Sequence, residues 1–145
     1  MNKEPENAPH EYCTDIIATY RGNLVAIERL KFPQGLALPG GRRDSIDGVL
    51  ESARSCALRE FTEETGLTLT IQGYLGRYDK AGRDPRGPKT SDVYFGVAEG
   101  AVQDEPGATR VVLIPWAEIP RHYERFVFDH ANVLHDYLRN KTRLE

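Results

Sequence analysis

The chain has 145 residues, enough for one domain of ordinary size with a real hydrophobic core. Hydrophobic residues make up 39% and charged residues 28%, which excludes a disordered or fibrous class, and no apolar run approaches the ~18 residues of a membrane-spanning helix. The formal net charge of −3 argues against a general affinity for nucleic acid, so we expect a cytoplasmic protein with no nucleic-acid or membrane partner, whose ligand could be a small anion.

The N-terminal segment, residues 1–11, is polar and acidic, so we expect a flexible tail followed by a single domain over residues 12–145. Cys13 and Cys56 are far apart and form no CxxC pair. Neither a zinc site nor a disulfide framework therefore has support, and both cysteines are expected to pack as small hydrophobic side chains.

The first part of the domain is predicted to be β-structure. Residues 15–20 and 24–30 are rich in β-branched and aliphatic side chains, and the Arg-Gly-Asn between them is typical of a tight turn, which predicts a hairpin. Residues 35–41 form a short apolar piece that ends in a Pro-Gly-Gly breaker.

Helical spacing appears next, from residue 49 to residue 65, and Gly66 follows where a helix C-cap glycine is expected. The later predicted elements are strands at 67–75, 92–100 and 109–116, a long charged loop at 77–91, and an amphipathic closing helix at 126–141. Strands and helices interleave without internal repeats, so the predicted fold class is α/β (α+β), with a mixed β-sheet flanked by helices.

The direction of the glutamates in helix 49–65 decides their role. Successive helical residues are about 100° apart, and counted from Leu50 the buried stripe includes Phe61 at about 20°. On the same count Glu60 lies at about 280° and Glu64 at about 320°, on the stripe or at its edge, while Glu63 flanks them near 220°.

Two interpretations of this acidic run are open. A solvated acidic face would put the carboxylates opposite the apolar stripe, which is not where the count places two of them. Carboxylates held against a core need compensating cations, and an oxygen-rich cluster suits Mg²⁺ or Mn²⁺. We therefore favour a metal site over a solvated face.

The spacing of these residues resembles the signature of the Nudix hydrolases. The matching residues are Glu51, seven residues and then Arg59-Glu60-Phe61-Thr62-Glu63-Glu64-Thr65-Gly66-Leu67, with Leu-Pro-Gly-Gly at 38–41 just upstream. The resemblance implies the Nudix fold, a mixed sheet sandwiched between helices. It also implies Mg²⁺ (or Mn²⁺), two to three ions, held by Glu60, Glu64, Glu63 and the carbonyl of Gly41. Arg59 and Glu51 would orient this cluster through an ion pair, with a plain surface arginine as the alternative, and Gly66 would end the helix.

This chain departs from the family at one place. Five residues usually separate the motif glycine from the first glutamate, whereas nine separate Gly41 from Glu51 here, which we interpret as a longer loop before the helix. The longer loop also puts Arg42 and Arg43 where they could face a phosphate.

Two further segments resemble the small ADP-ribose pyrophosphatases within the family, namely the loop from residue 81 and the segment 126–138 with its Asp-His pair. This resemblance implies metal-dependent hydrolysis of a nucleoside diphosphate linked to another group, with ADP-ribose giving AMP and ribose 5-phosphate. Arg83 and Arg86 would bind the substrate, because arginine suits bidentate phosphate contact. The alternative is that they pair with Asp84 and nearby acids.

The general base is implied to be a glutamate of the Nudix signature (Gly41 to Leu67, the Nudix box) or an acid on a later loop, where Glu99, Asp104 and Glu105 are candidates. We favour Glu105, with a solvated hairpin loop as the alternative. His130 and His135 are expected to pack or hydrogen-bond rather than to be ligands, and Trp116 to anchor a strand end.

Rival functions are a Nudix enzyme that removes nucleoside triphosphates and a non-catalytic Nudix-fold ligand sensor. Such sensors tend to have a degraded box and an appended DNA-binding domain, whereas Glu60, Glu63 and Glu64 are all present and the chain ends at Glu145. We therefore expect a catalyst that acts on a small-molecule nucleotide, and relatives of this kind suggest a homodimer.

Overall fold

A computed structural model describes residues 9–144 of the chain, and the predicted tail lies mostly outside this range. Glu11, which the prediction assigned to the tail, is the first residue of β1. In chain order the strands and helices are β1 (Glu11–Tyr20), β2 (Asn23–Arg29), β3 (Gly35–Ala37), β4 (Gly40–Arg42), β5 (Ser45–Ile46), β6 (Val49–Leu50), α1 (Ala53–Thr65), β7 (Thr68–Tyr78), β8 (Lys89–Glu99), β9 (Thr109–Pro115), α2 (Ile119–His122) and α3 (His130–Leu144).

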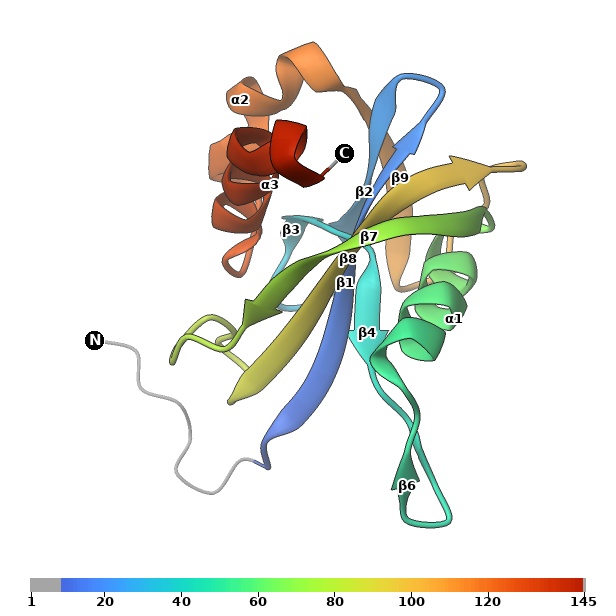
Figure 1. Cartoon of the computed structure of the whole chain (residues 1–145), viewed down its shortest axis with the longest axis vertical. Coiled ribbons are helices and arrows are strands. Elements are labelled where there is room, and N and C mark those ends of the chain that lie inside the picture. Colours follow the sequence, from blue (N-terminus) through green and yellow to red (C-terminus); the bar gives the residue numbers. More distant parts are fainter. Residues whose placement is uncertain (1–8, 145) are drawn as a thin grey trace.

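A mixed sheet forms the centre of the molecule, with strand order β3-β2-β1-β8-β7, and β4 and β9 pair with β1 and β2 respectively. β1 and β8 are parallel, whereas the other pairs are antiparallel. The mixed sheet and the helices around it confirm the predicted fold class (Figure 1).

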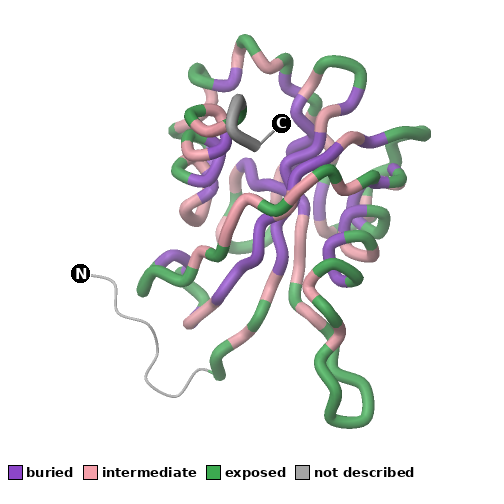
Figure 2. Tube along the Cα trace, in the orientation of Figure 1, coloured by how far each residue is buried: buried purple, intermediate pink, exposed green. Residues whose placement is uncertain are grey.

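Helices cover both faces of this sheet (Figure 1). Side chains alternate along a strand, so neighbouring residues of β1 face opposite cores. Ile16 and Ala18 pack in a cluster with Phe61 of α1, whereas Ile17 packs in a second cluster with Leu134 of α3. Figure 2 shows this buried centre, with exposed residues at the loops and on the outer sides of the helices.

β1 and β2 separate soon after the turn that joins them. Their pairing is limited to Thr19 with Leu24 and Tyr20 with Asn23. Beyond this point β4 pairs with β1, while β3 pairs with the far end of β2. The sheet is therefore split on one side, and side chains of both strands can line the opening.

The helix α1 begins at Ala53 rather than at residue 49. The Ser52 hydroxyl accepts a hydrogen bond from the Ser55 amide, 3.1 Å, and so caps the helix. Residues 45–50 instead form a separate hairpin, β5–β6, whose turn residues Asp47 and Gly48 both have positive φ, 52° and 77°. Leu50, the origin of the helical count, lies in β6, but the angles between the glutamates and Phe61 do not depend on that origin.

The other element boundaries also shift. β7 and β8 extend farther than predicted, which shortens the charged loop to residues 79–88. α3 begins at His130 rather than at residue 126, because Phe128 has a left-handed backbone, φ 60°, that a helix cannot contain. Within the described residues, no helix has both the length and the apolar character needed to cross a membrane.

Candidate active site

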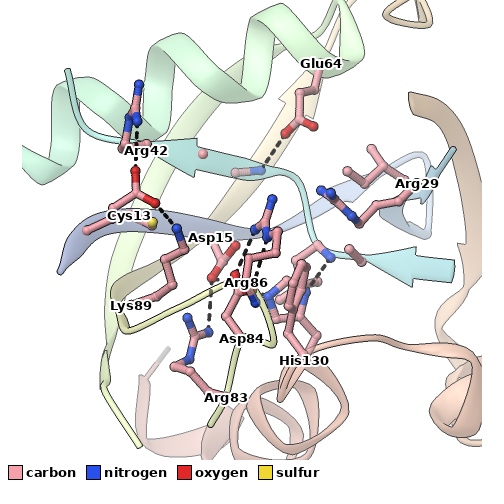
Figure 3. A pocket seen from close by; sticks show the side chains of 17 residues that line it. Cys13, Asp15, Arg29, Arg42, Glu64, Arg83, Asp84, Arg86, Lys89 and His130 are labelled. Carbon is pink, nitrogen blue, oxygen red and sulfur yellow. Dashed lines mark hydrogen bonds and ion pairs between the residues drawn. The ribbon is translucent and has the colours of Figure 1, made fainter. Parts of the chain in front are cut away.

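Glu64 is the most buried glutamate of the acidic run. The side of α1 that packs on the sheet carries Ala57 and Phe61, and Glu64 is on the same side, only 7% exposed. The Gly40 amide donates a hydrogen bond to its carboxylate at 2.7 Å (Figure 3). Burial raises the pKa of Glu64 to about 8, as expected for a carboxylate removed from water with no ion-pair partner among the described residues.

The site leaves no room for a side chain at Gly40 or at Gly41. A Cβ at Gly40 would lie 2.0 Å from the Thr14 carbonyl oxygen, and one at Gly41 would lie 2.3 Å from the carboxyl carbon of Glu60. β4 therefore passes directly beside the half-buried carboxylate of Glu60. The Leu-Pro-Gly-Gly motif and the acidic helix thus form one site.

Arg59 connects the remaining acidic residues of the box. It forms the predicted ion pair with Glu51, which lies just before α1, and also contacts Glu60 at 2.9 Å and Glu63 at 3.2 Å. Hydrogen bonding to Glu51, the strongest contribution, raises the pKa of Arg59, and the same contact lowers the pKa of Glu51. Glu63 is the exposed member of the group, so the predicted order of burial is confirmed.

The longer segment between Gly41 and Glu51 does not disturb this arrangement. The Glu51 amide donates to the Asp44 carbonyl at 2.8 Å, which closes the base of the β5–β6 hairpin. The additional residues project away from the body of the protein, as Figure 1 shows. Gly41 consequently keeps its place beside Glu60.

The donor set fits a hard divalent cation. Glu60, Glu64 and the Gly41 carbonyl offer oxygen, the donor that Mg²⁺ and Mn²⁺ prefer. Across the described residues, no three His, Cys, Asp or Glu side chains converge on one point. Mg²⁺ is commonly held by one or two carboxylates together with water and substrate phosphates, so an incomplete protein cage suits this ion.

A pocket of about 370 Å³ lies where β1 and β2 separate. Its lining includes the box residues Gly41 and Glu64 and the apolar side chains of Ile27 and Leu38. Cationic residues from several elements also line it: Arg29, Arg42, Arg83, Arg86 and Lys89 (Figure 3). A cavity that joins carboxylates to clustered cations can bind a metal and an anionic ligand side by side.

Arg83, a predicted substrate residue, reaches the pocket wall but is bound to acids. Its guanidinium donates to both carboxylate oxygens of Asp129, at 2.7 and 3.0 Å, and lies 3.5 Å from Asp15. Asp15 also accepts from the Ser91 hydroxyl at 2.6 Å. Arg83 thus pairs with Asp129, far along the chain and just before α3, rather than with the predicted Asp84 of its own loop.

His130 completes this buried cluster. Its Nδ1 accepts a hydrogen bond from the Leu38 amide at 2.9 Å, so its Nε2 faces Asp15 at 3.4 Å. Burial alone would raise the pKa of Asp15, yet its contacts with His130, Arg83 and Ser91 outweigh burial and lower that pKa to about 2. His130 therefore packs and hydrogen-bonds, as predicted, although it also lines the pocket.

The other candidate arginines divide into two groups. Arg86 pairs with Asp84 through two hydrogen bonds, 2.8 and 3.0 Å, as the alternative interpretation of this loop predicted. Arg42 lies at the pocket and pairs with Glu11 at 2.8 Å. Arg43 is outside the pocket lining and donates to the Glu51 carbonyl.

The three candidate bases lie in different surroundings. Glu105 is close enough for its charge to raise the pKa of Glu64, although burial is the main cause. Asp104 instead accepts a hydrogen bond from the Val111 amide, and Glu99 is exposed at the end of β8. Glu105 is thus better placed than the other two.

Sequence reasoning missed several pocket residues: Asp15, Arg29, Lys89 and Phe128. Arg29 is a strand residue with no motif around it, so only its position beside the opening identifies it. Two neighbouring aromatic residues of β8 lie in different surroundings. Phe95 is in the core, whereas Tyr94 is half-buried against Tyr74. Trp116 anchors the end of β9 by donating to Thr19, as predicted.

Comparison with known proteins identifies the family. The family model described as the NUDIX domain matches residues 10–137, so the chain belongs to the Nudix hydrolase family, and the resemblance seen in the sequence is confirmed. An ADP-ribose pyrophosphatase of Methanocaldococcus jannaschii is 33% identical over 120 residues, which cover 82% of this chain and 66% of that protein.

Solved structures agree on the fold. A bifunctional NMN adenylyltransferase/ADP ribose pyrophosphatase of Francisella tularensis, in complex with AMP and a manganese ion, has a TM-score of 0.78 at 22% identity, over 94% of this chain and 43% of that one. The NUDIX domain of Shewanella oneidensis NrtR, in complex with ADP ribose, has a TM-score of 0.76 at 21% identity, over 99% and 95%. The chain thus spans less than half of the Francisella protein and slightly under two thirds of the Methanocaldococcus one.

Proposed function

We propose that this chain catalyses the hydrolysis of a nucleoside diphosphate linked to another group, with ADP-ribose as the substrate. Water adds to one phosphorus of the pyrophosphate, the bridging P–O bond breaks, and AMP and ribose 5-phosphate leave. The observation that carries the proposal is that one pocket is lined by two residues of the box, Gly41 and Glu64, and by a group of cations. The Methanocaldococcus relative, named ADP-ribose pyrophosphatase, supports the choice of substrate.

In this proposal Glu60, Glu64 and the Gly41 carbonyl hold two to three Mg²⁺ or Mn²⁺ ions, with Glu63 assisting. When bound, such ions neutralise charge on phosphate oxygens and lower the pKa of coordinated water. The Arg59–Glu51 ion pair fixes the direction of Glu60, and the Gly40 amide fixes that of Glu64. The manganese ion bound to the Francisella protein supports this choice of metal.

The remaining residues bind and orient the substrate. Arg83 and Arg86 contribute to the positive wall of the pocket, and their carboxylate partners hold each guanidinium in place. Glu105 is the proposed base, because it is a candidate acid whose negative charge acts on Glu64. Ile27 and Leu38 add apolar surface to the pocket lining, which limits the water around a bound anion.

A substrate panel with and without Mg²⁺ tests the proposal, using ADP-ribose, nucleotide sugars, NADH, dinucleoside polyphosphates and nucleoside triphosphates. Release of AMP from ADP-ribose, dependent on metal and far above the other rates, is expected. Turnover of triphosphates would replace the substrate while keeping the metal site. Tight binding of ADP-ribose without any turnover would favour the rival function, a non-catalytic Nudix-fold ligand sensor.

Location and assembly belong to the same proposal. We propose a cytoplasmic protein that forms a homodimer, as the resemblance to the small ADP-ribose pyrophosphatases implies, and that uses a small-molecule nucleotide as its partner. Sedimentation of the full chain would test the dimer, with a monomer at all concentrations as the contrary result.

A further inference from the structure

The cations of the pocket differ in how far their charge is already balanced. Arg83 pairs with Asp129, Arg86 pairs with Asp84, and Arg42 and Lys89 share Glu11. In the portion of the chain that the structure describes, Arg29 has no carboxylate in an ion pair. It is thus the pocket cation that no described carboxylate pairs with directly, although Glu64 and Asp84 act on its charge from a greater distance.

Arg29 is at the end of β2, and its guanidinium is partly removed from water. It donates to two backbone carbonyls, those of Pro33 at 2.9 Å and Phe32 at 3.2 Å, which fix its direction but carry no net charge. Burial lowers the pKa of Arg29, and the nearby charge of Arg86 lowers it further. A half-buried cation in this setting is stabilised by an anion.

The ring of Phe128 brings Arg29 and Arg86 together. The guanidinium carbon of Arg29 is 5.4 Å from the centre of this ring, and that of Arg86 is 5.2 Å from it. Phe128 is held with φ 60°, an unusual backbone for an aromatic residue, and this conformation places its ring at the pocket. Two like charges thus share one ring beside an open cavity.

Glu64 lines the same pocket as Arg29, and its charge raises the pKa of Arg29, although burial has the larger effect (Figure 3). An anion bound between them would therefore contact Arg29 while it lies next to the proposed metal ligands. A phosphate group has the charge and the acceptor oxygens for this position, because the arginine fork matches its geometry.

We infer that Arg29 binds a phosphate group of the substrate and is the principal phosphate-binding cation of this pocket, a role that rests on the proposed function for its substrate. Arg83 and Arg86 then shape the pocket wall, while Arg29 supplies the positive charge that no ion pair already holds. The competing explanation is that Arg29 only fastens the turn at residues 32–33 to β2 through its carbonyl contacts.

The test compares the wild type with Arg29→Gln, Arg29→Lys and the control Arg110→Gln. Arg110 is an exposed arginine on β9, paired with Glu28 and outside the pocket lining. For each protein, calorimetry measures the Kd of inorganic pyrophosphate and of adenosine in the presence of Mg²⁺. Steady-state kinetics measure KM and kcat for ADP-ribose, and thermal unfolding reports on the fold.

We expect Arg29→Gln to weaken pyrophosphate binding on the order of tenfold or more. KM for ADP-ribose should rise similarly, while kcat changes less and adenosine binding stays the same. Arg29→Lys should lie between the wild type and Arg29→Gln, since lysine keeps the charge without the fork. Arg110→Gln should match the wild type.

Pyrophosphate affinity within twofold of the wild type in Arg29→Gln would overturn the inference, and so would an equal loss of adenosine binding, which a fastening role predicts. If Arg29→Gln does not fold, Arg29→Lys decides, and wild-type affinity in that variant is the contrary result. Should the wild type bind pyrophosphate but leave ADP-ribose intact, only the proposed substrate fails. A wild type that does not bind pyrophosphate overturns the role of Arg29.

Discussion

The buried carboxylate of Glu64 is the residue whose chemistry is easiest to isolate. In Glu64→Gln the amide oxygen can still accept the hydrogen bond of the Gly40 amide, so the fold should be retained. The variant loses the negative charge that would hold a divalent ion, so kcat should fall on the order of 100-fold or more. Initial rates with the best substrate of the panel, together with thermal unfolding, check this.

Glu63→Gln is the matched control on the same helix. Its side chain is exposed and lies outside the pocket lining, so its loss of rate should be clearly smaller. Equal rates for Glu64→Gln and the wild type would exclude a metal ligand at residue 64.

Asp15 makes stability depend on pH in a definite direction. Its pKa in the fold is about 2, below the ordinary value of 3.8, so the folded state favours the ionised form. This contribution, roughly 2 kcal/mol, is complete above the ordinary pKa and is lost as the pH falls from about 4 toward 2. The difference in unfolding free energy between the wild type and Asp15→Asn should therefore shrink over that range.

Urea unfolding at several pH values between 2 and 7 measures this difference. Asp79→Asn, at an exposed position in the loop that follows β7, is the matched control. A gap between the wild type and Asp15→Asn that stays constant from pH 7 to pH 2 would contradict the account of the buried cluster.

At the scale of elements, the β5–β6 hairpin is expected to be dispensable. It forms a two-stranded sheet of its own, and Ile46 and Val49 are 70% and 69% exposed. Its base is closed by the bond from the Glu51 amide to the Asp44 carbonyl, which a shorter turn can keep. Replacing residues 45–50 with two glycines should leave kcat/KM within about twofold, since loop length changes closure entropy only slightly.

Kinetics on this shortened protein, with its unfolding midpoint, provide the measurement. A large rise in KM at an unchanged midpoint would show instead that the hairpin contacts the substrate. Loss of the fold would mean that the hairpin is needed to place Glu51 against Arg59.

The sequence predicts what local patterns determine and misses what the assembled sheet determines. Periodicity placed Glu64 on the buried side of α1, and the C-cap at Gly66, φ 76°, is confirmed, because both depend on neighbours within a few residues. The partner of Arg83 is 46 residues away, and no local pattern could identify it. Arg29 lines the pocket only because β1 and β2 separate, which no local pattern indicates.

At the scale of the whole molecule, the pocket is lined by residues from both the N-terminal and the C-terminal parts of the domain. Its lining comes from β1 to β4, from the end of α1, from the loop before β8 and from the start of α3. A bound ligand should therefore stabilise the complete fold. AMP with Mg²⁺ at about 100 times Kd should add about 2.7 kcal/mol, equivalent to a rise in Tm of roughly 5–10 °C.

The same thermal measurement distinguishes the contribution of metal binding from the contribution of the phosphate contact. Adding EDTA should remove the part of the rise in Tm that depends on metal, and Glu64→Gln should behave as the wild type does in EDTA. In Arg29→Gln the metal alone should still stabilise, while the same concentration of AMP should add only about half as much, because a roughly tenfold weaker Kd leaves AMP at about 10 times Kd. If EDTA left the effect of AMP unchanged in the wild type, nucleotide binding would be independent of metal, and the carboxylates of α1 would need another role.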